Sequence, residues 1–249
     1  MSDWGLSALL FGAGVWAGAQ NALAGGGSFI TLPVLIVSGL DARAANITST
    51  LALFPGQVTT GWAGRGLVAG AERLSFGALA AISLLGGIAG AFLLLRTPPA
   101  LFAAMVPWLV LVATLLFAWS SFGPRPAAAP VPPPAWVSAL IQAAIATYGG
   151  FFGGGAGIMT LAALTLARMP VRNAAATKNV LVGLANVAAA GVLAFSGVVA
   201  WGSALALGAG SMLGGYAGAQ ALKRVPAQWL KVGVVAIGAA LTVALFLKG

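Results

Sequence analysis

The chain has 249 residues, of which 60% are hydrophobic and only 6% are charged. A soluble domain carries roughly 25% charged residues, so this composition excludes a largely water-facing surface and indicates a membrane protein in contact with lipid. The net charge of +9 does not indicate a nucleic-acid partner. The basic residues stand singly or in pairs between apolar runs, which is where membrane anchors lie.

Composition also excludes most catalytic and metal chemistry. The chain contains no cysteine and no histidine, and its three acidic residues are Asp3, Asp41 and Glu72. Metal, haem and iron–sulfur sites and most nucleophiles draw on these residue types. We therefore expect no cofactor and no metal site, and we expect that the protein is not an enzyme.

The apolar runs, measured against the roughly 20 residues of a spanning helix, predict roughly eight to ten membrane segments. The opening stretch, Trp4 to Leu40, is too long for one helix and is interrupted by glycine at 25–27, so we divide it near Ala24. The other runs of the first half are Ala45–Ala63, Leu74–Leu95 and Ala100–Trp119. Those of the second half are Trp136–Phe152, a short segment to Ala167, Ala174–Phe195, Trp201–Leu222 and Trp229–Leu247.

The two halves align with each other at a shift of about 128 residues. Gly25-Gly26-Gly27 falls on Gly153-Gly154-Gly155, and with one more residue of shift Arg43 and Thr48 fall on Arg172 and Thr177. Agreement in order along most of each half indicates an internal duplication. We predict an all-α polytopic fold of two related helical repeats, residues 1–120 and 136–249, joined by a proline-rich linker at 121–135.

The basic residues favour an inverted arrangement of the repeats. With five segments in each half the second repeat is inverted, both termini lie outside, and the cytoplasmic side collects most of the positive charge. The cytoplasmic residues are then Arg65, Arg73, Arg125, Arg168, Arg172, Lys178, Lys223, Arg224 and Lys231, against Arg43, Arg96 and Lys248. If each glycine-interrupted stretch crosses only once, the repeats run parallel and the charges divide more evenly.

Each glycine triplet weakens a helix at membrane depth and predicts a break there. Such a break frees backbone N–H and C=O groups that lipid does not satisfy, so it is expected where the backbone faces a cavity or protein. The segment that resumes at Ser28 would present a helix N-terminus, which attracts anions without a charged side chain. Two broken helices at matched positions point to the central site of a transporter. The alternative is that the glycines serve only close helix packing.

The motifs GGGSFITLP and AANITST of the first half, repeated as GGGAGIMTL and AAATKNV in the second, resemble the TauE/SafE family of sulfite and sulfonate exporters. The resemblance covers about residues 8–247. It implies a bacterial inner-membrane permease that moves small anions, typically sulfur oxyanions or organosulfonates, generally outward. Leu161 stands where the first repeat has Pro33, so we expect the second broken segment to be shaped differently.

Polar residues at matched places in the two repeats extend the predicted substrate site, and Gln57 pairs by position with Asn186. Intramembrane amides and hydroxyls suit sulfonate oxygens as donors, and the alternative is that they form interhelical hydrogen bonds. The predicted substrate-binding set is Gln20, Asn21, Gly25, Gly26, Gly27, Ser28, Thr48, Ser49, Gln57, Tyr148, Gly153, Gly154, Gly155, Thr177, Lys178, Asn179 and Asn186. Ser28 and Pro33 match Gly157 and Leu161, so we expect an asymmetric site with its basic group in the second half.

Lys178 is the most specific prediction among the substrate-binding residues. It lies about one turn into an apolar run, where an unpaired ammonium is costly, so it either attracts the anion or reaches back to the cytoplasmic interface. We interpret Asp41 and Glu72 as solvated loop charges. The sequence then contains no obvious intramembrane carboxylate that could relay protons.

We therefore expect a secondary transporter whose partners are a small anion and membrane lipid. An anion channel and a non-transporting scaffold subunit are the alternatives. The sequence leaves the oligomeric state open, a homo-oligomer included.

Overall fold

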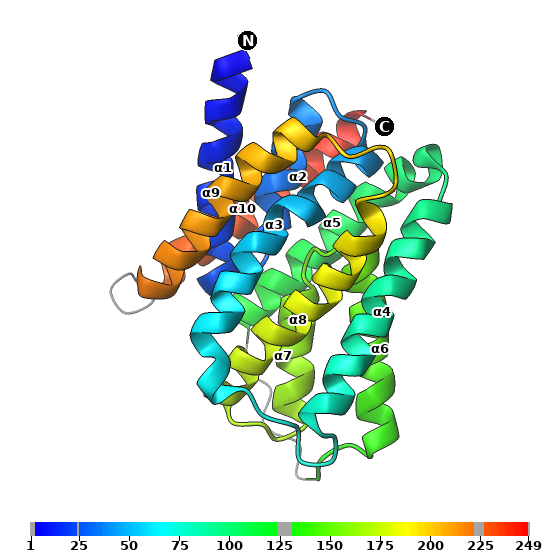
Figure 1. Cartoon of the computed structure of the whole chain (residues 1–249), viewed down its shortest axis with the longest axis vertical. Helices are drawn as coiled ribbons and strands as arrows, with labels where there is room; N and C mark the ends of the chain where they lie inside the picture. The colour runs from blue at the N-terminus through cyan, green and yellow to red at the C-terminus, as the bar shows by residue number, and fades with distance from the viewer. Residues whose placement is uncertain (1–2, 24, 124–130, 222–226, 249) are drawn as a thin grey trace.

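The structure is a computed structural model that describes residues 3–23, 25–123, 131–221 and 227–248. The first half contains α1 (Asp3–Leu23), α2 (Ser28–Val37), α3 (Ala42–Gly64), the short 3-10 helix η1 (Arg65–Leu67), α4 (Phe76–Arg96) and α5 (Pro99–Phe122). The second contains α6 (Ala135–Phe151), α7 (Ala156–Leu166), α8 (Val171–Leu193), α9 (Trp201–Ala221) and α10 (Ala227–Lys248) (Figure 1).

The predicted all-α membrane fold is confirmed. Within the described ranges α4, α5 and α8 are long and apolar enough to cross a bilayer. Of the predicted linker, residues 124–130 lie outside the described residues, as do Lys223 and Arg224 of the charge pattern. Asp41, expected to be a solvated loop charge, caps α3 by accepting hydrogen bonds from the backbone N–H groups of Arg43 and Ala44, each at 3.0 Å.

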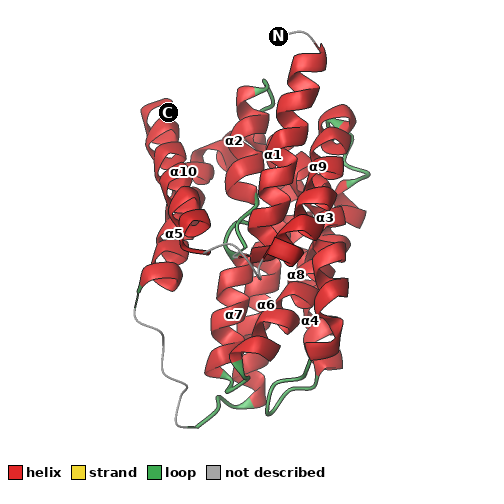
Figure 2. Cartoon of the chain, turned by 90° about the vertical axis from the view of Figure 1, so that its left-hand side faces the viewer, coloured by secondary structure: helices red, strands yellow, loops and turns green. Residues whose placement is uncertain are grey.

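The two broken helices are hairpins. We call α1 and α2 the first hairpin and α6 and α7 the second hairpin. In the first, a Cβ at Gly27 would lie 2.8 Å from the carbonyl oxygen of Ala17, and Ile30 packs with Ala13 and Ala17, so α2 returns along α1. In the second, α7 returns along α6 in the same way. The turns of both hairpins lie near the middle of the molecule (Figure 2).

Helices α3 and α8, which correspond in the two halves, run antiparallel. Asn173 donates to the carbonyl of Leu67 (2.9 Å), Asn186 to Gln57 (2.8 Å), and the backbone N–H of Ala200 to Thr48 (3.2 Å). The residue numbers rise along the second half of the chain as those of their partners fall along the first half. Such a crossing fits a two-fold axis perpendicular to the helices, as inverted repeats predict and parallel repeats do not. Gln57 and Asn186, which pair by sequence shift, bond to each other where that axis would pass.

The fourth helix of each half packs against the first helix of the other half. A Cβ at Gly90 of α4 would collide with the carbonyl of Thr147 on α6, and one at Gly218 of α9 would lie 2.9 Å from the carbonyl of Ala19 on α1. These are matched contacts, because both pairs differ by the same repeat shift. Glycine allows this backbone contact in a membrane, where close packing replaces hydrophobic association. Helices α5 and α10 pair with each other to one side of this bundle (Figure 2).

The loops divide between two ends of the molecule. The beginning of α1, the end of α10 and the turns at 38–41, 97–98 and 194–200 lie at one end (Figure 1). The loops at 65–75 and 167–170 lie at the other. This second end carries the exposed residues Arg65, Arg73, Arg168 and Arg172.

Candidate functional site

The turns of the two hairpins meet at the centre of the bundle. A Cβ at Gly153 would lie 3.7 Å from the hydroxyl oxygen of Ser28. The turns depend on glycine, because Gly25 and Gly26 have φ angles of 82° and 85°, and Gly153 and Gly155 have 81° and 83°. The broken segments predicted from the triplets therefore exist, and they place the N-termini of α2 and α7 side by side.

The two tips differ in shape, at the glycines rather than at Pro33. Gly27, which precedes α2, is right-handed with φ −54°, whereas Gly155, which precedes α7, is left-handed with φ 83°. Pro33 lies inside α2 without breaking it, and α2 and α7 have nearly equal lengths of 10 and 11 residues. The difference expected from Pro33 and Leu161 is thus small.

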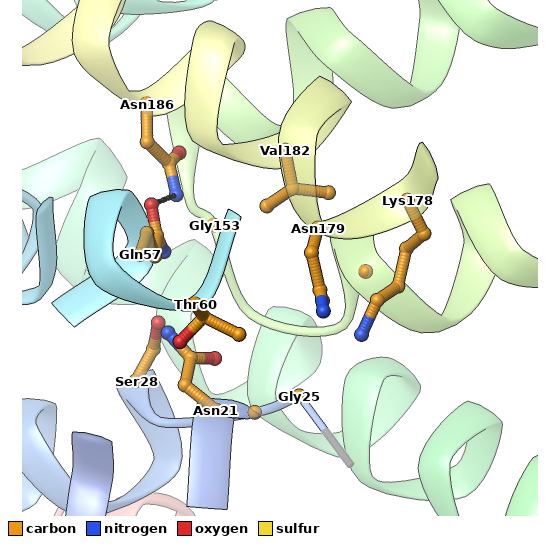
Figure 3. A pocket seen from close by; sticks show the side chains of 12 residues that line it. Asn21, Gly25, Ser28, Gln57, Thr60, Gly153, Lys178, Asn179, Val182 and Asn186 are labelled. Carbon is orange, nitrogen blue, oxygen red and sulfur yellow. Dashed lines mark hydrogen bonds between the residues drawn. The ribbon is translucent and has the colours of Figure 1, made fainter. Parts of the chain in front are cut away.

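A small polar cavity lies between the tips, α3 and α8 (Figure 3). Its volume of about 30 Å³ is enough for about two water molecules, since one water needs roughly 10–15 Å³. Nine of its twelve lining residues belong to the predicted set: Asn21, Gly25, Gly26, Ser28, Gln57, Gly153, Lys178, Asn179 and Asn186. The other three are Thr60, Gly157 and Val182.

Lys178 supplies the positive charge of the cavity. Its side chain is only 7% exposed, and it extends from α8 along the N-terminal turn of α7. A Cβ at Gly157 would lie 3.6 Å from its Cδ and 4.0 Å from its Nζ. Lys178 has no ion-pair or hydrogen-bond partner among the described residues. The lysine therefore reaches the cavity and does not turn back to the interface.

Amides surround the ammonium on the other sides of the cavity. Asn179 extends from α8 next to Lys178, and Asn21 approaches from the end of α1 (Figure 3). The Asn21 side chain accepts a hydrogen bond from the backbone N–H of Gly27 at 3.2 Å, which fixes the amide against the first tip. Its remaining NH₂ group can donate to an anion. Gln57 and Asn186 also line the cavity and form the interhelical hydrogen bond given as the alternative.

Other predicted residues support the site from outside the cavity. Thr48 and Thr177 occupy matched places and hold a loop of the opposite half, because the backbone N–H groups of Ala200 and Ala69 donate to their hydroxyls at 3.2 and 3.0 Å. Ser49 bonds to Thr31 of α2 at 2.5 Å.

The remaining predicted residues belong to the tips themselves. Gln20 donates to the carbonyl of Gly25 at 3.3 Å, and its Oε1 is buried without a partner. The partly buried Tyr148 packs on Phe152, and its buried hydroxyl also lacks a partner. Neither residue lines the cavity, and neither do Gly27, Gly154 and Gly155.

The sequence missed Thr60 and Gly157 as cavity residues. Thr60 is buried, its hydroxyl bonds to the carbonyl of Gly56 at 2.8 Å, and no motif marks it. Gly157 was noted only as the counterpart of Ser28. Its role follows from the repeat shift, since Ser28 and Ser49 of the first half correspond to Gly157 and Lys178 of the second. Loss of the side chain at 157 leaves room for the lysine stem.

The described residues contain no cluster of His, Cys, Asp or Glu that could hold a metal ion. The chemistry of the cavity is that of hydrogen-bond donors and one cation.

Comparison with known proteins agrees with this architecture. The family model described as sulfite exporter TauE/SafE matches residues 10–245. The chain belongs to the TauE/SafE family. A probable membrane transporter protein, ORF9, of Sinorhizobium sp. is 32% identical over 96% of this chain and 92% of its own length. A probable membrane transporter protein of Haemophilus influenzae is 28% identical over 86% of this chain and 84% of its own. No solved structure matches the chain. As a TauE/SafE member, the protein is a multi-pass membrane transporter.

Proposed function

We propose that the protein is a secondary transporter of small anions, with sulfite, organosulfonates or related sulfur-containing anions as its substrates. The observation that carries the proposal is the polar cavity between the two hairpin tips, in which Lys178 has no counter-ion among the described residues. An unpaired ammonium inside a membrane protein is costly, so a position that keeps one is expected to serve a function. Binding of an anion would offset its charge.

The donors of the cavity suit a compact oxyanion. Helices α2 and α7 begin at glycines without a side-chain cap, so their positive ends face the cavity together. Asn21 and Asn179 add amide donors to the same cavity. Charge-assisted hydrogen bonds to an ionised ligand are stronger than neutral ones, and a trigonal or tetrahedral oxyanion uses several at once.

Alternating access would arise from movement of the hairpins. The cavity is too small for an organosulfonate as it stands, so binding requires one tip to separate from the other. The arrangement of matched contacts supports inverted repeats, in which the movement of one hairpin opens the site to one side and that of the other hairpin to the opposite side. We propose that the end of the molecule with the loops at 65–75 and 167–170 is cytoplasmic in the bacterial inner membrane, because it carries the arginine excess.

The direct test is flux into proteoliposomes. Purified protein should transport radiolabelled sulfite or methanesulfonate with saturation, and unlabelled anion on the opposite side should stimulate uptake. Protein-free liposomes are the control. Flux that does not saturate would favour a channel, and transport of no anion from a broad panel would contradict the proposal.

A further inference from the structure

We propose that the transporter is an obligatory anion exchanger, because Lys178 prevents the empty site from changing sides. The inference rests on the proposed function and adds its mode: the protein exchanges one anion for another and does not catalyse net efflux at a comparable rate. The reason is the charge of the central cavity in its loaded and empty states.

Lys178 is the lone charged group of the cavity among the described residues. The elements packed against α8 are α3, α4, α6, α7 and η1. Their charged residues are Arg43, which donates to the carbonyl of Leu95 at 2.9 Å, and the exposed residues Arg96 and Arg65. None of the three lines the cavity, and α6 adds only the hydroxyl of Tyr148, which does not line it either. The loop at 65–75 also packs on α8, through the hydrogen bond of Ala69 to Thr177, but its charged residues Glu72 and Arg73 are exposed and do not line the cavity.

The groups next to Lys178 do not offset its positive charge either. The N-terminus of α7 carries a positive partial charge, and Gly157 of its first turn lies against the Lys178 stem. Asn179 presents an amide, which offers at most a neutral carbonyl to the ammonium. Nothing in this set replaces a carboxylate.

The loaded and empty states therefore differ by one full charge. With a singly charged anion bound, the cavity contains one positive and one negative charge and is neutral overall. Without the anion, any reorientation through a closed state buries an uncompensated ammonium, which is strongly unfavourable in a membrane. The loaded carrier changes sides readily and the empty carrier does not.

The same balance favours singly charged substrates. A dianion leaves one uncompensated negative charge in the closed cavity, so it is expected to exchange more slowly than a monoanion of similar size. Methanesulfonate is a monoanion with the tetrahedral head group of sulfate, which makes the two a matched pair of probes.

The experiment compares exchange with net efflux. Proteoliposomes loaded with radiolabelled methanesulfonate are diluted into buffer that contains either unlabelled methanesulfonate or only an impermeant anion. Potassium with valinomycin prevents a membrane potential from limiting net efflux. We expect exchange to exceed net efflux at least about tenfold, a modest ratio for a charge moved into a membrane interior. External sulfate should stimulate the efflux of labelled methanesulfonate less than external methanesulfonate does.

Two substitutions assign the effect to Lys178. Lys178→Met removes the charge, and Gly157→Asp places a carboxylate beside the ammonium. Each should reduce the ratio of exchange to net efflux to within about twofold of unity, even if total flux falls. Arg172→Met, on the exposed face of the same helix, should keep the wild-type ratio.

The outcomes separate this inference from the proposed function. Absence of flux in both modes contradicts anion transport itself. Measurable flux with a wild-type ratio below about tenfold overturns obligatory exchange, whether or not protons accompany net efflux. A ratio that persists in both Lys178→Met and Gly157→Asp overturns the role of the lysine. If both variants are inactive, Lys178→Arg must retain the ratio, and a collapsed ratio there also overturns that role.

Discussion

The two hairpins are built on the same plan, yet they contribute different chemistry to the cavity. The first hairpin has Ser28 at its tip, and the adjacent helix α3 has Ser49, which bonds to Thr31. The second hairpin has Gly157 at the equivalent place, and α8 has Lys178 where α3 has Ser49. One repeat closes its site with neutral hydrogen bonds, and the other leaves an unpaired cation there. The difference between the two hairpins therefore lies at two matched positions, and one of these gives the second half its charge.

Accessibility of the two ends of the molecule tests whether the two halves are inverted in the membrane. The chain has no cysteine, so single cysteines can be introduced without background. The two substitutions are Glu72→Cys and Val198→Cys, at exposed residues of the loops at 65–75 and 194–200. These loops lie at opposite ends of the molecule (Figure 1). In intact cells we expect a membrane-impermeant maleimide to label position 198 and not position 72. Labelling of both positions from outside would contradict inverted repeats, and permeabilised cells provide the control.

Lys178→Met removes the charge that distinguishes the second half. We expect anion affinity to fall about 10- to 100-fold, the range for loss of a charge-assisted hydrogen bond. The thermal midpoint in detergent should rise by a few degrees, because the substitution relieves an unpaired buried charge. Scintillation proximity binding and differential scanning fluorimetry measure the two effects.

A matched control separates the cavity from helix α8 in general. Arg172→Met changes an exposed residue of the same helix and should leave both affinity and thermal midpoint near wild type. A Lys178→Met protein that loses stability and keeps its affinity would show that the lysine is structural.

Substitutions at the two tips should differ in a way that reflects their shapes. Gly155 has a left-handed φ of 83°, so Gly155→Ala should cost about 1–2 kcal/mol, and Gly155→Asn should cost less because Asn tolerates this region. Gly27 has an ordinary φ of −54°, but a Cβ there would meet the carbonyl of Ala17 at 2.8 Å. Gly27→Asn should therefore be worse than Gly27→Ala.

Thermal unfolding in detergent ranks the stability of the Ala and Asn variants at each tip. Gly183→Ala, on α8 with no atom within 4 Å of the new Cβ, is the control and should stabilise by up to about 1 kcal/mol. If Asn were less destabilising than Ala at both tips, or more destabilising at both, the two tips would not have the different backbone shapes described here.

Loss of the hydrogen bond between the two halves should change the free energy of unfolding less than the substitutions at the tips. Asn186 donates to Gln57 at 2.8 Å, and both residues occupy the same place in their repeats. A double-mutant cycle of Gln57→Met and Asn186→Leu should give a coupling energy of about 0.6 kcal/mol, the average for such bonds in membranes. Additive effects on unfolding would show that the two amides do not meet.

The sequence predicted the elements of this fold better than their direction. Hydropathy and the glycine triplets located both broken helices, and the repeat shift paired Gln57 with Asn186. Neither signal states whether α2 continues through the membrane or returns along α1, because an apolar run is compatible with both. The return depends on contacts such as Gly27 against Ala17, which involve the three-dimensional path of the backbone.

The cavity shows a similar division. Lys178 and the amides stood out because charge and amides are rare in apolar runs. Thr48 and Thr177 were equally conspicuous, but they hold loops of the opposite half, and a hydroxyl in a helix gives no sign of which partner it will meet. Thr60 and Gly157 carried no chemical signal, since one is a common helical residue and the other contributes only space.

A structure of the protein determined in the presence of a small sulfonate or sulfite would show directly whether the anion binds at Lys178. We expect anion density between the two hairpin tips, within hydrogen-bonding distance of Lys178 Nζ and beside Gly157 and Asn179. The Lys178→Met protein should lack that density under the same conditions. Density elsewhere in the molecule, or equal occupancy in the variant, would contradict a site built around the lysine.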